Sequence, residues 1–539
     1  MRRWLIAVAL FAAAAAVPRA PSSAAEAVRY RFTFPEPSQQ WMQVDAIFAE
    51  LTSAPLQLRI SRSSPGRYAI HDFAKNVYDV HAYGPGDREL RLERPDDAGW
   101  TVATHPGRVT IKYKVYGNRL DGTYLAIDSS HAHINMPAAI LWARGLDDRP
   151  ATLTFAPPAG AQWQVATQLH GEGPPDDARR PVPDRYEFTA PNLQYLMDSP
   201  VEFGPITIET FTIGPRMFRF AAHQTGTRTE LQAFVTDAAK IVRQEGAIFG
   251  EFPSYDPGFY TFLADYLPYA STDGMEHRNS TVMTSPGSIA NARAELLDTV
   301  AHEFFHSWNV ERIRPRSLEP FDFDRTNPSG ELWLAEGFTQ YYGPLAMQRA
   351  GLLGIDPMAR MISSVLNSVG VESGRLARSA EEISRLGEFT DRTDADPPGR
   401  VIDVMSYYQL GAAIALSLDL SLRERSNGAL SLDDFMREMW RRYGKPGGAR
   451  EGYVDRPYTI ADAEATLAAV SGDAAFARDF FTRYIQGHEL ADYRRLLVSA
   501  GFLVRTASRG RVDVVPVESA GGTLTPAQRE FRASWLGAK

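Results

Sequence analysis

The sequence contains no cysteine among its 539 residues. The fold therefore has no disulfide bond, and any metal site has to use histidine and carboxylate side chains instead of thiolates. Beyond the N-terminus the sequence also lacks an uninterrupted apolar run of the ~20 residues that a membrane-spanning helix needs. These absences exclude a disulfide scaffold, a thiolate zinc site and a polytopic membrane protein.

Positive charge is not in excess either. Lys and Arg number 57 against 65 Asp and Glu, which gives a formal net charge of −8. No run of basic residues stands out, so nucleic acid is not an expected partner. The sequence also lacks a G-x-S-x-G nucleophile elbow and a phosphate-binding glycine loop, and it therefore gives no support to covalent serine catalysis or nucleotide chemistry.

What the N-terminus does contain is the pattern of an export signal. Arg2 and Arg3 precede an apolar run from Trp4 to Val17, and small residues follow up to Ala25. This pattern predicts a signal peptide over residues 1–25 and an exported protein, periplasmic or extracellular, without stable membrane insertion after cleavage. An uncleaved N-terminal anchor is the alternative.

The length predicts roughly two to four domains. From Val28 to Pro200 apolar residues alternate with polar ones, and clusters of Pro and Gly punctuate them, which predicts an antiparallel β-sandwich over residues 26–205. Near Gly226 the spacing becomes helical, from Leu231 to Val242, which indicates that a second domain begins.

The rest of the chain is divided by the same criteria. We expect an α/β catalytic domain over residues 206–345, a helical domain over 346–503 and a short tail over 504–539. Ser431 resembles the start of a capping box, and Asp473–Tyr484 is an amphipathic stretch. The predicted fold class is multidomain α+β.

The clearest chemical signal is the pair His302 and His306 with Glu303 between them, inside an apolar helical segment. A spacing of four residues places both imidazoles on one face of a helix, where they can bind one zinc ion. A glutamate directly after the first histidine can accept a proton from a water whose acidity the metal has increased. Glu336, on a further predicted helix, supplies a third ligand and leaves one position for water.

These stretches, His302–Pro315 and Leu332–Gly337, resemble the glycyl aminopeptidase family of gluzincin metallopeptidases. The similarity extends over about residues 29–503. It includes Ser63–Tyr68, where Ser63 replaces the usual Trp, and Tyr195–Pro200, which closes the N-terminal domain in the family. The resemblance implies that the catalytic domain is thermolysin-like and that the substrate is a peptide with a free N-terminus.

The resemblance also implies roles for two further segments. Gly274, Met275 and Glu276 look like the edge-strand motif that recognises a free α-amino group, with Asp273 in place of the family's first Gly. A carboxylate is a physically reasonable partner for an ammonium group in a partly dry cleft. Tyr408 resembles the tyrosine that donates to the oxyanion, although Leu410 replaces the usual Lys, and Tyr407 remains an alternative.

Other polar residues have simpler interpretations. The alternation of His131 and His133 favours structural or exposed strand residues. Arg312 and Arg314 are expected to form salt bridges more than to bind a substrate carboxylate. Asp298, one turn before the first histidine of the motif, is a candidate for orienting that imidazole.

The sequence therefore predicts a zinc-dependent aminopeptidase, and the resemblance implies a preference for small N-terminal residues such as Gly or Ala. The alternatives are a zinc endopeptidase and a non-catalytic peptide-binding protein with structural zinc. Many relatives carry a PDZ-like module after the helical domain. The stretch after Gly501 is too short for such a module, which we expect to be absent or vestigial.

Overall fold

The computed structural model describes residues 25–171, 183–371, 377–391, 405–507 and 510–537. The predicted signal peptide, apart from its last residue, lies outside these ranges. None of the helices within them combines the length and the apolar character that crossing a bilayer requires.

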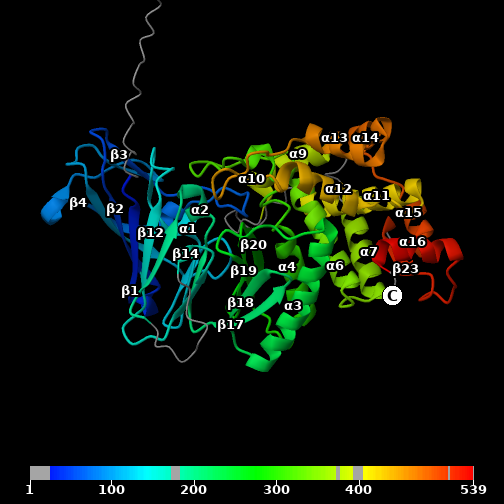
Figure 1. The fold of residues 1–539 in the computed structure, drawn as a ribbon, viewed down its shortest axis with the longest axis horizontal. Helices are drawn as coiled ribbons and strands as arrows, with labels where there is room; N and C mark the ends of the chain where they lie inside the picture. The colour runs from blue at the N-terminus through cyan, green and yellow to red at the C-terminus, as the bar shows by residue number, and fades with distance from the viewer. Residues whose placement is uncertain (1–24, 172–182, 372–376, 392–404, 508–509, 538–539) are drawn as a thin grey trace, which may run out of the picture.

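The chain forms three consecutive parts (Figure 1). A β-rich N-terminal region lies at one end, a central sheet covered by helices α3 and α4 follows, and a helical region forms the other end. The structure thus shows a multidomain fold with mixed sheets and a helical C-terminal region.

The largest N-terminal sheet has the strand order β14-β15-β12-β1-β2-β8-β4-β5. Its strands are β1 (Val28–Glu36), β2 (Trp41–Phe48), β4 (Val77–Gly84), β5 (Arg88–Leu90), β8 (Val109–Tyr116), β12 (Ala151–Ala156), β14 (His170–Gly171) and β15 (Tyr186–Ala190). Every second residue of β8 is buried, as the alternation predicts. However, β1 pairs with β12 in parallel, so the sheet is mixed and the prediction of a purely antiparallel sandwich is wrong. The long connection between these two strands provides the crossover that parallel pairing requires.

Two four-stranded sheets pack against this one. The first has the order β13-β16-β10-β9 and the second the order β11-β3-β7-β6. Their strands are β3 (Leu56–Arg59), β6 (Glu93–Asp96), β7 (Gly99–Val102), β9 (Leu125–Ile127), β10 (Ala132–Ile134), β11 (Trp142–Ala143), β13 (Gln164–Thr167) and β16 (Val201–Gly204). One apolar core joins all three sheets through residues such as Phe32, Leu58 and Phe203.

The central sheet has the order β17-β18-β19-β21-β20. Its strands are β17 (Thr207–Ile213), β18 (Arg216–Gln224), β19 (Phe259–Tyr266), β20 (Asp273–His277) and β21 (Ser280–Ser285). Strands β18, β19 and β21 run parallel, whereas β20 pairs antiparallel with β21 and forms one edge. This edge strand carries the predicted amine-binding motif.

Helices α3 (Arg228–Phe249) and α4 (Arg293–Phe305) cover one face of the central sheet (Figure 1). Thr227 and Glu230 form a reciprocal capping box at the start of α3, and Gly250 ends the helix with a φ of 80°. The helix predicted there is confirmed, and its helically spaced apolar residues are buried: Leu231, Phe234, Val235, Ala238, Ile241 and Val242.

The helical region consists of α5 (Leu332–Ala335), α6 (Gly337–Arg349), α7 (Ile355–Val371), α9 (Ala380–Arg385), α10 (Gly387–Thr390), α11 (Tyr407–Ser426), α12 (Leu432–Met439), α13 (Ile460–Ser471), α14 (Ala474–Phe480) and α15 (Tyr493–Ser499). Ser431 does cap α12 through a reciprocal capping box, as predicted. Helix α6 runs through position 345, the predicted border of the catalytic domain.

One apolar core extends from the central sheet through these helices to the end of the described chain. Strands β22 (Phe502–Thr506) and β23 (Val512–Pro516) form a hairpin, and α16 (Pro526–Leu536) follows. Trp535 is fully buried and donates to the Tyr341 hydroxyl at 2.8 Å. The tail is therefore docked on the helical region.

Candidate active site

Helix α4 carries His302 and Glu303, and His306 is the residue that caps its C-terminus. Its apolar side chains, including Leu297 and Phe304, pack into the central core and fix the orientation of the helix. The rings of His302 and His306 lie one turn apart, with centroids 4.9 Å from each other. The His306 side chain is buried, whereas 17% of the His302 side chain is exposed. The pair therefore stands at the boundary between core and solvent.

Glu336 lies between α5 and α6, where the helix is interrupted instead of running through the residue. Its Oε2 atom lies 3.6 Å from His302 Nε2 and 3.4 Å from His306 Nε2. One ligand atom from each of these three residues falls within 4.8 Å of the other two. The structure thus brings the three predicted ligands to one point.

These donor atoms fit a divalent metal ion. His306 Nε2 is buried without a hydrogen-bond partner among the described residues, while Nδ1 donates to the carbonyl of Asn309 at 2.6 Å. Donation from Nδ1 leaves the lone pair on Nε2, the nitrogen that faces Glu336. Burial raises the pKa of Glu336, but the charges and hydrogen bonds of the two histidines outweigh burial and hold it well below its usual value. The carboxylate is therefore ionised and able to act as a ligand.

Asn309 connects the two halves of this ligand set. Its side-chain amide donates to the carbonyl oxygens of Leu334 and Ala335, both at 3.0 Å. Because its own carbonyl accepts from His306, Asn309 fixes the second histidine relative to the segment that precedes Glu336. Sequence reasoning placed this asparagine in the family stretch but gave it no role.

The N-terminal region reaches the site through Tyr68. The Tyr68 hydroxyl donates to Oε1 of Glu336 at 2.5 Å, and its backbone N–H donates to Asp391 at 2.9 Å. Burial and the charge of Glu336 raise the pKa of Tyr68 well above its ordinary value, so the phenol remains a donor. Sequence reasoning missed this contact. The only available signal was that Tyr68 ends the family motif that begins at Ser63.

Glu303 faces the edge strand β20. A Cβ atom on Gly274 would lie 2.1 Å from Oε1 of Glu303, so only glycine permits this close approach. Burial raises the pKa of Glu303, and the neighbouring His302 and His306 act in the opposite direction. Oε2 of Glu303 is buried without a partner in the described part of the chain. The predicted base thus has one oxygen against the strand and one free to accept a proton.

Glu276 lies next to this carboxylate. One ligand atom of Glu276 falls within 4.8 Å of atoms of Glu303 and His306, and its Oε1 has no hydrogen-bond partner among the described residues. Burial raises its pKa well above the ordinary value for glutamate. The Met275 side chain points away from the cleft, because it packs against Gly66. Of the three predicted substrate-binding residues, the structure therefore brings Gly274 and Glu276 to the site, whereas Met275 has only its backbone to offer.

The end of the N-terminal region holds β20 and the turn after it in place through Asp198. Asp198 accepts from His277 Nδ1 at 2.9 Å and from the backbone N–H of Arg278 at 3.1 Å. Arg278 in turn forms an ion pair with Asp256 at 2.6 Å. Since His277 directly follows Glu276, these contacts fix the position of the unpartnered carboxylate.

Tyr408 approaches the site from α11. A Cβ atom on Gly411 would lie 2.1 Å from the Trp333 carbonyl, and one on Gly337 would lie 2.3 Å from Gly411 Cα. The two glycines therefore let α11 cross the start of α6 at close range, which brings Tyr408 to within 6.1 Å of His302, measured between ring centroids. Tyr407 is buried and packs edge-on against Tyr68 instead of lining the cleft.

A cleft of about 360 Å³ lies beside His302, Glu303 and Tyr408. Its lining includes Arg67, Asp273, Gly274, Asp298, His302, Glu303, Gln340 and Tyr408. Arg67, which sequence reasoning missed, donates to Asp273 at 2.7 Å. The aspartate that replaces the family's glycine is thus an anchor for the N-terminal region. A larger cavity of about 790 Å³ beside residues 320–328 contains none of the predicted catalytic residues.

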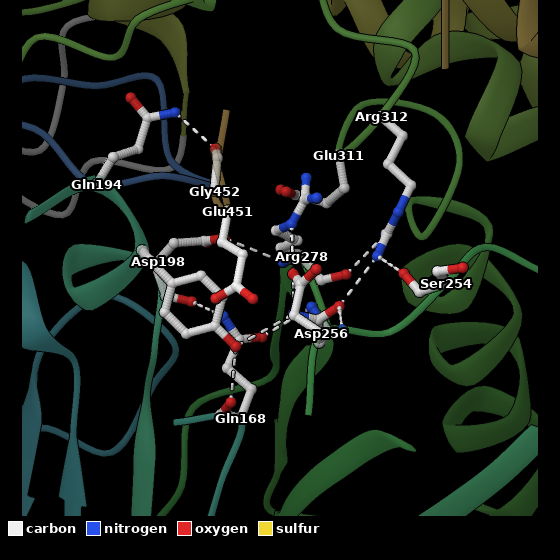
Figure 2. Close-up of polar contacts among 12 residues, drawn as sticks. Gln168, Gln194, Asp198, Ser254, Asp256, Arg278, Glu311, Arg312, Glu451 and Gly452 are labelled. Carbon is white, nitrogen blue, oxygen red and sulfur yellow. Dashed lines mark hydrogen bonds and ion pairs between the residues drawn. The ribbon is translucent and has the colours of Figure 1, made fainter. Parts of the chain in front are cut away.

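The remaining polar candidates have structural partners. Arg314 forms ion pairs with Glu311 at 2.6 Å and Glu319 at 3.2 Å, as expected. Arg312 forms no ion pair with any described residue, which corrects the prediction. It instead donates to backbone carbonyls such as that of Ser254 at 2.8 Å (Figure 2). Oδ1 of Asp298 is buried without a partner among the described residues, so its orientation of His302 stays a prediction.

Solved structures with the same fold are known. An aminopeptidase N family protein from Idiomarina loihiensis aligns over 91% of this chain and 85% of its own, with 24% identity and a TM-score of 0.79. An M1 zinc metallopeptidase variant from Deinococcus radiodurans, bound to a Tyr-Ser-Ala substrate, aligns over 87% of this chain and 95% of its own, with 15% identity and a TM-score of 0.51. A search of curated protein sequences finds no match.

Family sequence models match both parts of the chain that build the site. The model of the peptidase M61 N-terminal domain matches residues 29–205, which include Arg67, Tyr68 and Asp198. The model of the M61 glycyl aminopeptidase domain matches residues 295–414, which include the ligand set, Glu303 and Tyr408. The two matches together span more than half of the sequence, and the chain belongs to the M61 glycyl aminopeptidase family.

Proposed function

We propose that the protein is a zinc-dependent aminopeptidase that hydrolyses the N-terminal peptide bond of peptides. The observation that carries the proposal is the position of two buried carboxylates, Glu303 and Glu276, beside a single set of metal ligands. A metallopeptidase needs one carboxylate to move protons. A second one, without a partner, is what an enzyme specific for a free amino terminus requires.

His302, His306 and Glu336 would hold the zinc ion through two imidazole nitrogens and one carboxylate oxygen, a donor set typical of catalytic zinc. When bound, zinc polarises the scissile carbonyl and increases the acidity of water. Tyr68 and Asn309 keep the ligands in place through the hydrogen bonds described above. Such outer partners fix ligand orientation and basicity.

Glu303 would act as the general base and then as the general acid. Its unpartnered Oε2 accepts a proton from the attacking water as the water oxygen bonds to the carbonyl carbon. The same carboxyl group then gives this proton to the amine nitrogen as the C–N bond breaks. The backbone of Gly274 limits the movement of Glu303 from the opposite side.

Glu276 would bind the α-ammonium group of the substrate. A buried carboxylate without a partner is costly, and its raised pKa reflects that cost. A substrate ammonium supplies the missing positive charge and a charge-assisted hydrogen bond. The amino terminus would thus fix the distance from the first residue to the scissile bond.

Tyr408 would donate to the oxyanion that develops on the scissile carbonyl. Burial and the charge of Glu336 raise its pKa well above the ordinary value for tyrosine, so the phenol keeps its proton. A neutral donor aimed at developing negative charge stabilises the transition state more than the ground state.

The space beyond Glu276 supports a preference for substrates whose N-terminal residue is small, such as Gly or Ala. A cavity on that side, lined by Gly66, Tyr68 and Leu318 among others, has a volume of only about 30 Å³. On the same measure, this is less than a tenth of the cleft of about 360 Å³ beside His302 and Glu303. A long first side chain would find no room there.

Two alternatives remain testable. An endopeptidase would cleave acetylated peptides as fast as free ones, but it would have no use for the unpartnered Glu276. A peptide-binding protein with structural zinc would not need Glu303 beside the metal ligands. We further propose that residues 206–345 form a thermolysin-like catalytic unit and that the protein acts after export, in the periplasm or outside the cell.

A release assay on aminoacyl fluorogenic amides, with and without a chelator, tests the proposal. We expect hydrolysis of glycyl and alanyl amides, loss of activity with chelator, recovery with zinc and no cleavage of the N-acetylated forms. Equal cleavage of free and acetylated substrates would show that the protein is an endopeptidase and not an aminopeptidase. No release of any amide by the zinc-loaded protein would reject catalysis.

A further inference from the structure

A second group of histidine and carboxylate side chains lies where the N-terminal region meets the central sheet. It consists of His131, Glu202, His223 and Asp265, which we term the joint cluster. One ligand atom from each residue falls within 4.8 Å of those of the other three. The cluster shares no residue with the candidate active site.

Three residues of the joint cluster lie in cross-strand pairs, one pair in each of the two sheets. Glu202 on β16 is the register partner of His133 on β10, and His223 on β18 is the register partner of Asp265 on β19. Two positions earlier on the same faces, Ala221 and Leu263 pack in a small apolar core with Ala166 of β13. The cluster therefore lies between the N-terminal sheet and the face of the central sheet that α3 and α4 leave uncovered.

Each residue of the joint cluster carries an unsatisfied polar atom. His131 Nε2, His223 Nδ1, Glu202 Oε1 and Asp265 Oδ1 are all buried without a hydrogen-bond partner in the described part of the chain. His131, Glu202 and Asp265 are at most 2% exposed. His223 Nδ1 and Asp265 Oδ1 lie 3.6 Å from each other, too far for a hydrogen bond. Buried polar atoms are nearly always paired in folded proteins, so these four atoms indicate a missing ligand.

Neighbouring residues orient the cluster in the manner of outer metal partners. Nδ1 of His131 lies 3.2 Å from Asp128, which leaves Nε2 as the free nitrogen. Nδ1 of His133 lies 3.2 Å from Oε2 of Glu202, the oxygen opposite the orphan Oε1. A carboxylate on one imidazole nitrogen and a metal on the other is a common arrangement, because it fixes the tautomer and raises ligand basicity.

Two of the four side chains of the joint cluster, Glu202 and Asp265, are carboxyl groups at most 2% exposed. Two buried carboxyl groups side by side are costly unless a positive charge lies between them.

We propose that the joint cluster binds a divalent metal ion, with zinc preferred for its two imidazole and two carboxylate ligands. Four protein ligands complete a tetrahedral zinc site and leave no position for a reacting water, which is the pattern of a structural site. Because 12% of the His223 side chain is exposed, the ion can reach the cluster from that side. The metal would clamp the region that carries Tyr68 and Asp198 onto the central sheet.

Metal content of the full-length protein tests the proposal. The variant His302→Ala/His306→Ala, which lacks the catalytic ligands, is incubated with excess zinc, desalted and measured by mass spectrometry. We expect one zinc ion per chain, and two in the wild type. No retained zinc in this variant would overturn the proposal without any change to the joint cluster.

A second set of variants locates the ion. In the His302→Ala/His306→Ala background, adding Glu202→Gln and His223→Ala should lower the zinc content from one ion to less than 0.1 per chain, because two of the four proposed ligands are changed. His81→Ala is the matched control, since that histidine is half exposed and lies outside both clusters. Equal zinc in both variants would place the ion elsewhere and overturn the assignment. Circular dichroism confirms that the compared chains are folded.

Discussion

The catalytic ligand set (His302, His306 and Glu336) and the joint cluster use the same chemistry in different surroundings. The catalytic set has three ligands, one partly exposed histidine and a cleft of about 360 Å³ beside it. The joint cluster has four ligands between two sheets, and Asp128 and His133 support it from outside. A metal with three protein ligands keeps a position for water, whereas one with four is closed.

The difference lies in what surrounds the ligands more than in the ligands themselves. The catalytic set has two additional carboxylates, Glu303 and Glu276, that are not needed to hold a metal and have free oxygens. In the joint cluster, by contrast, one ligand atom from each of the four residues lies within 4.8 Å of the other three. The number of neighbouring carboxylates that do not bind the metal therefore distinguishes a catalytic site from a structural one. The following predictions test this distinction.

The largest effect is expected for Glu303→Gln. Removal of the general base should lower kcat by about 10²–10⁴-fold, while zinc content stays at the wild-type value. Glu295→Gln, an exposed change on the same helix, is the matched control and should retain activity. Stopped assays on glycyl amides together with metal analysis measure both quantities, and unchanged turnover in Glu303→Gln would contradict the proposed mechanism.

Glu276→Gln should have the second-largest effect, on substrate binding more than on the chemical step. Loss of one charge-assisted hydrogen bond costs about 1.5–3 kcal/mol, which corresponds to roughly 10–100-fold in kcat/KM for substrates with a free amine. Most of the change should appear in KM. If the variant distinguishes free from acetylated peptides as well as the wild type does, Glu276 is not the amine-binding residue.

Tyr68→Phe tests whether the N-terminal region takes part in catalysis. The change removes only the hydroxyl that donates to Glu336, and outer partners of this kind typically contribute 10–100-fold in metal affinity or activity. We expect a loss near 10-fold that added zinc partly restores. Tyr78→Phe is the control, because Tyr78 is 46% exposed in the same region. Equal activities of the two variants would show that the Tyr68 contact is dispensable.

Sequence reasoning found the catalytic set because its residues are close along the chain. A helix repeats every 3.6 residues, so the spacing of His302 and His306 alone fixes their common face. Glu336 is also near in the sequence, since it lies between the next two α-helices, α5 and α6. Tyr68 has no such constraint: it hydrogen-bonds to a residue 268 positions away, across two domains of the fold. Its role became visible only with the packing of those domains.

The joint cluster shows the same limit more strongly. Three of its four residues lie on three different strands and the fourth directly precedes a strand, and no spacing rule connects them. The alternation of His131 and His133 indicated a strand, and His133 does lie on β10 while His131 directly precedes it. The alternation gave no information about what the facing sheet would present. The parallel pairing of β1 with β12 was missed for the same reason, since alternation determines which face is buried and not which strand is the neighbour.

The smallest effect on activity is expected for His223→Ala, and it provides the sharpest contrast between the two groups of ligands. A metal present at about 1,000 times its Kd stabilises the folded state by about 4 kcal/mol, so its loss should lower the first thermal transition by several degrees. Activity at 25 °C should fall by less than about threefold, since the active-site ligands remain intact. His302→Ala should also unfold at a lower temperature, because the catalytic zinc too binds only the folded chain, but its activity should be lost. Calorimetry and the amide assay on both variants measure this contrast in activity. If His223→Ala unfolds at the same temperature as the wild type, no metal ion in the joint cluster stabilises the contact between the two sheets.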